Sequence, residues 1–226
     1  MSMLSNLDLI RRVPLFAVLT SAQTESLADA VDKRRYKRGE RIVTQGEKSD
    51  ALSIILAGRA RVLITDRKGR EVILATLKPG DYIGEMSLID NEPHSASVEA
   101  EIQTDVLTLG RADFTRCLHE NNSMMQAVMR GLVQRLRSAD RKIESLALMG
   151  VYARVADALI MQATPVSEGS EVRIIREKMS RQDIAKMVGA SREMVSRVMK
   201  DFEEQGFIET REDGAILVVE RRKSQR

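Results

Sequence analysis

The sequence predicts an α+β fold in which an antiparallel, jelly-roll-like β-roll is followed by a long helix and a C-terminal winged helix-turn-helix. Three observations support this fold class. Short β-prone segments alternate with glycines between residues 38 and 111, apolar residues then recur every three or four positions, and two capped helical patterns flank the glycine at position 189. A chain of 226 residues is long enough for two domains. We expect the β-roll at 1–120, the long helix at 121–149 and the winged helix-turn-helix at 150–226.

The segment from Arg38 to Arg111 is typical of an antiparallel sheet with tight turns. Its turn signals recur at intervals of about a strand and a turn, and they are Gly46, Gly58, Gly69 and Gly80. This spacing favours a sandwich or a roll. The Lys68-Gly69 pair marks the tip of one predicted hairpin.

The periodicity changes after Asp113, where apolar residues follow alternating spacings of three and four. The residues of this seam are Met129, Leu132, Leu136, Ala139, Ile143 and Leu146. They predict a helix over about 122–147, roughly 40 Å long at 1.5 Å per residue. The seam either packs on the helix's own domain or forms a two-chain coiled coil. We favour the coiled coil, and hence a homodimer, because the spacing persists for nearly three heptads.

The most specific signal in the chain lies within residues 179–220. Ser180 can cap a first helix, Gly189 ends that helix and permits a tight turn, and Ser191 can cap a second helix. The residues expected on the buried side of the second helix are Met194, Val195, Val198 and Phe202. This spacing predicts a helix-turn-helix.

The outward side of the second helix carries polar groups that can recognise bases. They are Ser191, Arg192, Glu193, Arg197 and Lys200. Arginine can form two hydrogen bonds with guanine in the major groove, and glutamate can accept one from the cytosine amino group. Charged helix faces are usually no more than solvated, but the preceding capped helix and a predicted two-stranded wing at 205–220 favour DNA recognition. A loop is expected at 167–170 and a basic tail at 220–226.

These features resemble the Crp/Fnr family of bacterial transcription regulators over residues 15–220. The resemblance implies a homodimer on double-stranded DNA, with RNA polymerase as a further partner to test. It implies a TGTGA-like half-site, present twice in a palindrome and contacted by Ser191, Arg192, Glu193 and Arg197. Ser180 and Gln182 match family positions that hold phosphates. Met194 has no polar atom for specific pairing, so packing is its expected role.

Residues 84–98, GEMSLIDNEPHSASV, fall where cyclic AMP binders of the family hold their effector. By this resemblance the effector-binding segment includes Gly84, Glu85, Met86 and Ser95. His94 departs from the family pattern, because the cyclic AMP binders have arginine there. Arginine offers a permanent charge and a planar fork of donors, whereas the charge of histidine depends on pH.

The long helix carries two more departures. Arg135 matches an arginine that braces the family's pocket, but Ala139 and Asp140 replace a threonine and a serine that contact adenine. A carboxylate has no donor for adenine, but it can accept from the N1–H and 2-amino groups of guanine. We therefore favour cyclic di-GMP as effector over cyclic AMP. A vestigial pocket in an effector-independent regulator also remains open, as does a nucleotide-sensing regulatory subunit that binds a protein instead of DNA.

The composition argues against several other classes of protein. A single cysteine, Cys117, cannot supply a disulfide, a multi-cysteine zinc site or an iron-sulfur cluster within one chain, and no residue matches the family's haem ligands. The only histidines are His94 and His119, and no catalytic pair is evident, so we expect neither a metal nor an enzyme. No apolar run approaches 20 residues. The expectation is a soluble, cytoplasmic protein without a membrane partner.

Overall fold

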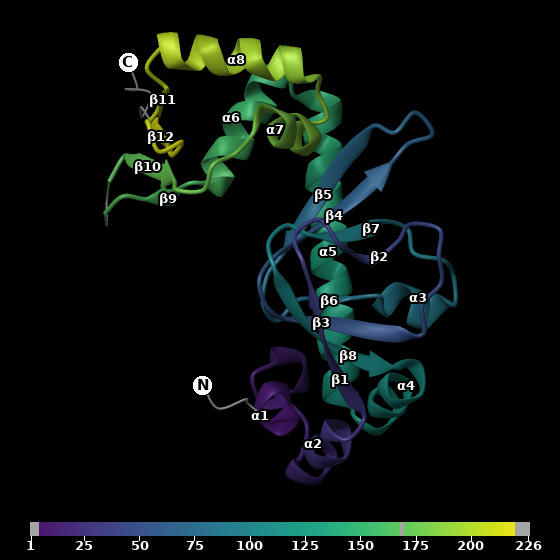
Figure 1. Ribbon diagram of the computed structural model, residues 1–226. Helices are drawn as coiled ribbons and strands as arrows, with labels where there is room; N and C mark the ends of the chain where they lie inside the picture. The colour runs from purple at the N-terminus through teal and green to yellow at the C-terminus, as the bar shows by residue number, and fades with distance from the viewer. Residues whose placement is uncertain (1–4, 168–169, 220–226) are drawn as a thin grey trace. The chain divides into compact units, whose positions relative to one another are not determined.

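The computed structural model describes residues 5–167 and 170–219 and has the α+β fold that the sequence predicts (Figure 1). The chain divides into two compact units, Met1–Ala139 and Asp140–Arg226. The predicted basic tail at 220–226 and the centre of the predicted loop at 167–170 lie outside the described residues.

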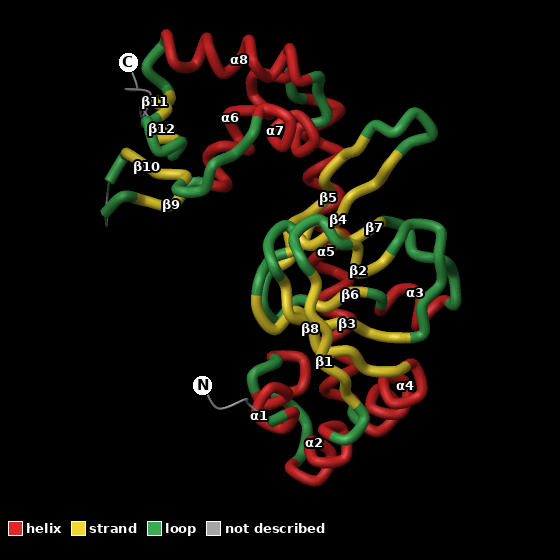
Figure 2. The backbone as a smooth tube through the Cα atoms, in the orientation of Figure 1, coloured by secondary structure: helices red, strands yellow, loops and turns green. Residues whose placement is uncertain are grey.

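Two four-stranded antiparallel sheets form the β-roll of the first unit, with the strand orders β1-β8-β3-β6 and β2-β7-β4-β5 (Figures 1 and 2). The described strands are β1 (Val31–Tyr36), β2 (Arg41–Val43), β3 (Ala51–Ala57), β4 (Ala60–Thr65), β5 (Glu71–Leu77), β6 (Tyr82–Ile83), β7 (Ser97–Ala100) and β8 (Thr104–Gly110). Strands β3 and β8 pair over most of their length and form the centre of the first sheet.

Glycine-containing turns connect these strands, as the sequence predicts. At the tip of the β4-β5 hairpin, one Asp66 carboxylate oxygen accepts the backbone N–H groups of Lys68 and Arg70, and Gly69 has a φ of 76°. At Gly58, between β3 and β4, φ is 95° and a Cβ atom would lie 2.4 Å from the carbonyl oxygen of Gln103. Only glycine fits there.

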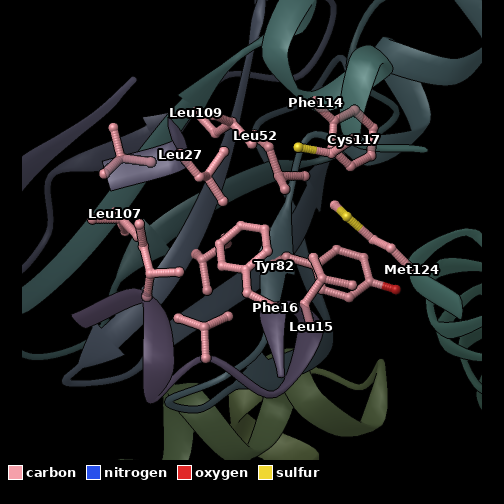
Figure 3. Packing of buried hydrophobic residues seen from close by; sticks show 14 of the residues in the cluster. Leu15, Phe16, Leu27, Leu52, Tyr82, Leu107, Leu109, Phe114, Cys117 and Met124 are labelled. Carbon is pink, nitrogen blue, oxygen red and sulfur yellow. The ribbon is translucent and has the colours of Figure 1, made fainter. Parts of the chain in front are cut away.

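Helices pack on the β1-β8-β3-β6 sheet to form the main core of the first unit. They are α1 (Asn6–Arg11), the 3-10 helix η1 (Pro14–Phe16), α2 (Ser21–Ala28), α4 (Arg111–Glu120) and the first turns of α5 (Asn122–Leu148). Side chains from these helices meet side chains from the sheet in Figure 3, including Phe16, Leu27, Leu52, Tyr82, Leu107, Leu109, Phe114 and Met124. The short helix α3 (Glu85–Asp90) follows β6 directly.

Helix α5 has 27 residues and ends one residue beyond the predicted limit of about 147. Met124 and Val128 are buried in the core of the first unit, so the beginning of the helix packs on its own β-roll. Most of the predicted seam is nevertheless exposed: the exposed fraction is 49% for Met129, 61% for Leu136 and 64% for Ile143. The helix thus carries a large apolar surface that the described chain leaves uncovered.

The second unit contains α6 (Val151–Gln162), α7 (Arg181–Val188), α8 (Arg192–Glu204) and a four-stranded sheet with the order β11-β12-β10-β9. Its described strands are β9 (Thr164–Pro165), β10 (Val172–Ile175), β11 (Ile208–Thr210) and β12 (Ile216–Val219). Its core includes Val155, Leu159, Ile184, Val195, Val198, Met199 and Val218. Within the ranges that the structure describes, no helix is both long enough and apolar enough to cross a bilayer.

Candidate nucleic-acid interface and effector site

Helices α7 and α8 form the predicted helix-turn-helix. The Ser180 hydroxyl oxygen accepts the N–H of Asp183 at 3.0 Å, which caps α7. Gly189 ends α7 in the left-handed region, with φ of 64° and ψ of 48°. The Ser191 hydroxyl oxygen then accepts the N–H of Met194 at 3.2 Å, which caps α8. The two hydroxyl caps and the glycine turn that the sequence predicts are therefore all present.

The end of α5 supports this turn from within the second unit. The Lys142 ammonium group donates to the carbonyl oxygen of Met187 in the last turn of α7, where a positive charge interacts favourably with the helix dipole. Burial lowers the pKa of Lys142, and the neighbouring charge of Arg154 lowers it further. The side chain of Leu146 also lies close to Gly189, because a Cβ atom on Gly189 would be 3.2 Å from it.

The buried side of α8 differs from the sequence prediction at one position. Val195, Val198 and Phe202 are buried as expected, but Met194 is 36% exposed. Met199 is fully buried instead. The prediction that Met194 packs in this core is therefore wrong. The buried stripe of a helix repeats every three to four residues, and position 194 lies beside that stripe.

The polar side of α8 faces solvent, as the sequence predicts. The residues Ser191, Arg192, Glu193, Arg197 and Lys200 are all exposed. Neither Arg192 nor Arg197 forms an ion pair with another described residue, so both guanidinium groups are available to a ligand. The backbone N–H of Glu193 and the Ser191 hydroxyl lower the pKa of the Glu193 carboxyl group. At neutral pH this carboxylate is ionised and can only accept hydrogen bonds.

The residues expected at DNA phosphates lie at the start of α7. Ser180 and Gln182 are both exposed. The Ser180 hydroxyl is already engaged, because it also donates to the Asp183 carboxylate at 2.7 Å. The predicted wing is present as the β11-β12 hairpin, in which Ile208 pairs with Val218.

The candidate effector site is centred on a buried carboxylate in the first unit. Gly84 caps α3 with φ of 95°, and a Cβ atom there would lie 2.9 Å from the carbonyl oxygen of Ala51, so only glycine fits. Glu85 is 1% exposed, and its Oε1 lies 2.5 Å from Nη1 of Arg135. Burial raises the pKa of Glu85, and the charge of Arg135 opposes this shift. The structure thus brings together three of the predicted effector residues.

Tyr82 completes this arrangement, although the sequence did not single it out. The second terminal nitrogen of Arg135 donates to the carbonyl oxygen of Tyr82, and the guanidinium carbon lies 4.9 Å from the centre of the Tyr82 ring. The Tyr82 hydroxyl donates to the carbonyl oxygen of Val128 at 3.3 Å. It also occupies the space beside Gly131, where a Cβ atom would lie 1.9 Å from the hydroxyl oxygen. Helix α5 can approach the roll this closely because residue 131 has no side chain.

His94 is buried beside this site rather than directed to solvent. Its Nε2 atom lies 2.8 Å from Oγ of Ser49, and its Nδ1 atom lies 3.2 Å from Oγ of Ser87. Burial lowers the pKa of His94 below its ordinary value of 6.5, against a smaller opposing effect of Glu47. At neutral pH the imidazole is therefore uncharged and bonded on both nitrogens, unlike an arginine at this position.

The other predicted effector residues are more open. Ser95 and Met86 are exposed, on the loop after α3 and on α3 itself. Ala139 and Asp140 are exposed positions of α5, about one turn beyond Arg135. Among the described residues, no group of three or more histidine, cysteine or acidic side chains could hold a metal ion.

Two family models match the chain in agreement with this geometry. The cyclic nucleotide-binding domain matches residues 33–121, and the Crp-like helix-turn-helix domain matches residues 153–223. The cAMP-activated global transcriptional regulator Vfr of Pseudomonas aeruginosa is 32% identical over 83% of this chain and 88% of its own length. The chain belongs to the Crp/Fnr family.

A second relative and one solved structure are also similar to the chain. The cAMP-activated global transcriptional regulator CRP of Salmonella typhimurium is 31% identical over 82% of this chain and 88% of its own length. The solved structure of the c-di-GMP-responsive global regulator CLP of Xanthomonas campestris covers 90% of this chain and 100% of its own, with a TM-score of 0.76 and 21% identity. The present Crp/Fnr protein is thus a Crp-like DNA-binding regulator with a cyclic nucleotide-binding domain.

Proposed function

We propose that this chain is a cytoplasmic, homodimeric transcription regulator that binds a palindromic TGTGA-like site under the control of a cyclic nucleotide. The observation that carries the DNA-binding part is the exposed polar side of α8, which begins at the capped Ser191. Arg192 and Arg197 present unpaired guanidinium groups for guanine, and Glu193 presents an ionised acceptor for cytosine. Ser180 and Gln182 would hold phosphates beside the groove, and RNA polymerase remains a partner to test.

The exposed stripe of α5 supports the homodimer. Met129, Leu136 and Ile143 recur at intervals of seven along the helix, and each is about half exposed or more. A seven-residue apolar repeat is the pattern by which two helices pack side by side. A two-fold dimer would place two copies of α8 about one turn of DNA apart, as a palindrome requires. In this proposal residues 1–120 bind the effector, 121–149 form the dimer helix and 150–226 bind DNA.

For the effector we favour cyclic di-GMP over cyclic AMP. The neutral, internally bonded His94 offers no permanent charge for a cyclic phosphate. Asp140 is an exposed carboxylate that matches the N1–H and 2-amino groups of guanine, and Ala139 has no polar group for adenine. Arg137, exposed on the same helix, can stack on a purine or pair with a phosphate.

Cyclic AMP is the second candidate, because Gly84, Glu85 and Arg135 match the residues of the family's cyclic AMP binders and lie together. The relatives Vfr and CRP, at 32% and 31% identity, are both described as cAMP-activated. A vestigial pocket is the third possibility, since Arg135 of the same chain compensates the charge of Glu85.

Titration calorimetry with cyclic AMP, cyclic GMP and cyclic di-GMP distinguishes these three possibilities. We expect the tightest binding with cyclic di-GMP and a loss of that binding in Asp140→Ala. Glu144→Ala is the matched control, because Glu144 is an exposed carboxylate four residues further along α5. Tighter binding of cyclic AMP would reverse the ranking, and no heat with any ligand would indicate a vestigial pocket.

DNA binding is tested separately by a gel shift at a stated salt concentration, because the affinity of such proteins depends strongly on salt. We expect a duplex with a TGTGA palindrome to be retarded at lower protein concentration than a scrambled duplex. Equal affinity for both duplexes would contradict sequence-specific binding. No retardation of either duplex would favour a regulatory subunit that binds a protein partner instead of DNA.

A further inference from the structure

Met194 is an unusual residue on the outward side of α8. It is 36% exposed, and it is not among the described residues that form the buried cluster of the second unit or pack against it. No other residue of α8, all of which are described, is an exposed large hydrophobic. Burial against its own domain therefore leaves more than a third of this residue exposed.

The position of Met194 within α8 places it next to residues that are suited to contact bases. It lies in the first turn of the helix, and the Ser191 hydroxyl fixes its backbone N–H at 3.2 Å. Residues three apart on a helix are neighbours, so Met194 adjoins Arg197. In helix-turn-helix proteins the first residues of the second helix contact base edges in the major groove. A flexible thioether is thus held among charged side chains at the end of α8 that would enter the groove.

The major groove offers one apolar group to such a side chain. Thymine carries a C5-methyl group there, and the other three bases carry none. Methionine is unbranched and polarisable, so it adapts to a methyl group without an exact fit. We propose that Met194 contacts the C5-methyl group of one thymine in each half-site and thereby specifies thymine at a position that the neighbouring charged residues do not read. This inference rests on the proposed binding of DNA by α8.

The test compares thymine with uracil, which lacks only the methyl group. A binding site is first selected from random DNA with the wild-type protein. Each thymine of one half-site is then replaced singly by uracil, and affinity is measured by fluorescence anisotropy. We expect the wild-type protein to bind roughly fourfold more weakly at one of these replacements, the amount that corresponds to one buried methyl group. All other replacements should change affinity much less.

The variants assign this effect to the side chain. Met194→Ala should lose the preference for thymine over uracil at that position, whereas Met194→Leu should retain most of it. Met161→Ala is the matched control, because Met161 is an 86% exposed methionine on α6 of the same unit. The Met161→Ala variant should show the same preference for thymine over uracil as the wild type. Thermal unfolding of all three variants checks that each is folded, as expected for exposed positions.

Two results would overturn the inference. One is a wild-type protein that tolerates uracil equally at every thymine, and the other is a Met194→Ala variant that keeps the wild-type preference. Failure to select any DNA sequence with the wild-type protein, both without effector and with cyclic AMP, cyclic GMP or cyclic di-GMP, would contradict the proposed function itself. The two failures are therefore distinguishable.

Discussion

Substitution of Gly131 by alanine should destabilise the first unit, although the same change stabilises most helices. In an exposed helix interior, alanine is favoured over glycine by about 1 kcal/mol. Gly131 lies within α5, and a Cβ atom there would lie 1.9 Å from the hydroxyl oxygen and 3.0 Å from Cζ of Tyr82. The first distance is about 1.5 Å short of 3.4 Å, where ordinary contacts begin.

The ring of Tyr82 has little freedom to yield to the new methyl group. Tyr82 is only 9% exposed, its hydroxyl is bonded to the carbonyl oxygen of Val128, and Arg135 lies over its ring. Overpacking of this kind costs about 1–3 kcal/mol, and a lost hydroxyl bond costs about 1 kcal/mol. After the gain in helix propensity is subtracted, we expect the free energy of unfolding to fall by about 1–3 kcal/mol.

Urea unfolding followed by far-ultraviolet circular dichroism measures this change. The matched comparison is the same substitution in a Tyr82→Phe background, where the hydroxyl oxygen is absent and the nearest atom is Cζ. Gly131→Ala should cost less there, by about 1 kcal/mol or more, because the two positions are coupled through direct contact. A Gly131→Ala protein more stable than the wild type would refute this reasoning, as would equal effects in both backgrounds.

Three further predictions concern DNA, pH and assembly. Arg192→Ala should lose about 1–3 kcal/mol of discrimination at one base pair, whereas Lys200→Ala should weaken all duplexes alike; uniform loss for both in a gel shift would argue against base contact by Arg192. The pKa of His94 is lower in the folded chain than its unfolded value of about 6.5. The neutral His94 therefore contributes to the free energy of unfolding above about pH 6.5, and this contribution is lost as the pH falls below that value. His94→Gln should flatten that part of a urea stability profile, and an unchanged pH dependence would contradict this. Leu136→Glu should reduce the mass measured by sedimentation to that of a monomer, whereas Met161→Glu, at a more exposed site, should not.

Local patterns explain why the helix-turn-helix could be predicted in detail. The hydroxyl caps at Ser180 and Ser191 and the left-handed turn at Gly189 depend on residues within four positions, so the sequence contains all the information they need. The limits of α5 follow in the same way from a regular apolar period. Met194 was wrongly predicted to be buried because a single helical pattern does not fix where the edge of the buried stripe lies.

Contacts between distant segments could not be predicted in this way. His94 is bonded to Ser49, 45 residues earlier, so neither its burial nor the direction of its pKa shift is visible in a local motif. The Tyr82 hydroxyl fills the space at Gly131 only because the fold brings β6 against α5. The aromatic residue two positions before Gly84 was a weak signal of this contact, and a lone tyrosine at the end of a strand has no specific interpretation.

The ion pair between Glu85 and Arg135 imposes a condition on any molecule that enters the site. A buried carboxylate that loses its cation without replacement is strongly destabilised. A ligand that draws Arg135 away must therefore offer Glu85 a donor of its own, such as a ribose hydroxyl, while an anion that offers none must leave the pair intact. The internal pair thus competes with any ligand, and the affinity measured for an effector is the difference between the contacts that the effector makes and the internal pair that it replaces. Selectivity can arise from this exchange even where few side chains recognise the base.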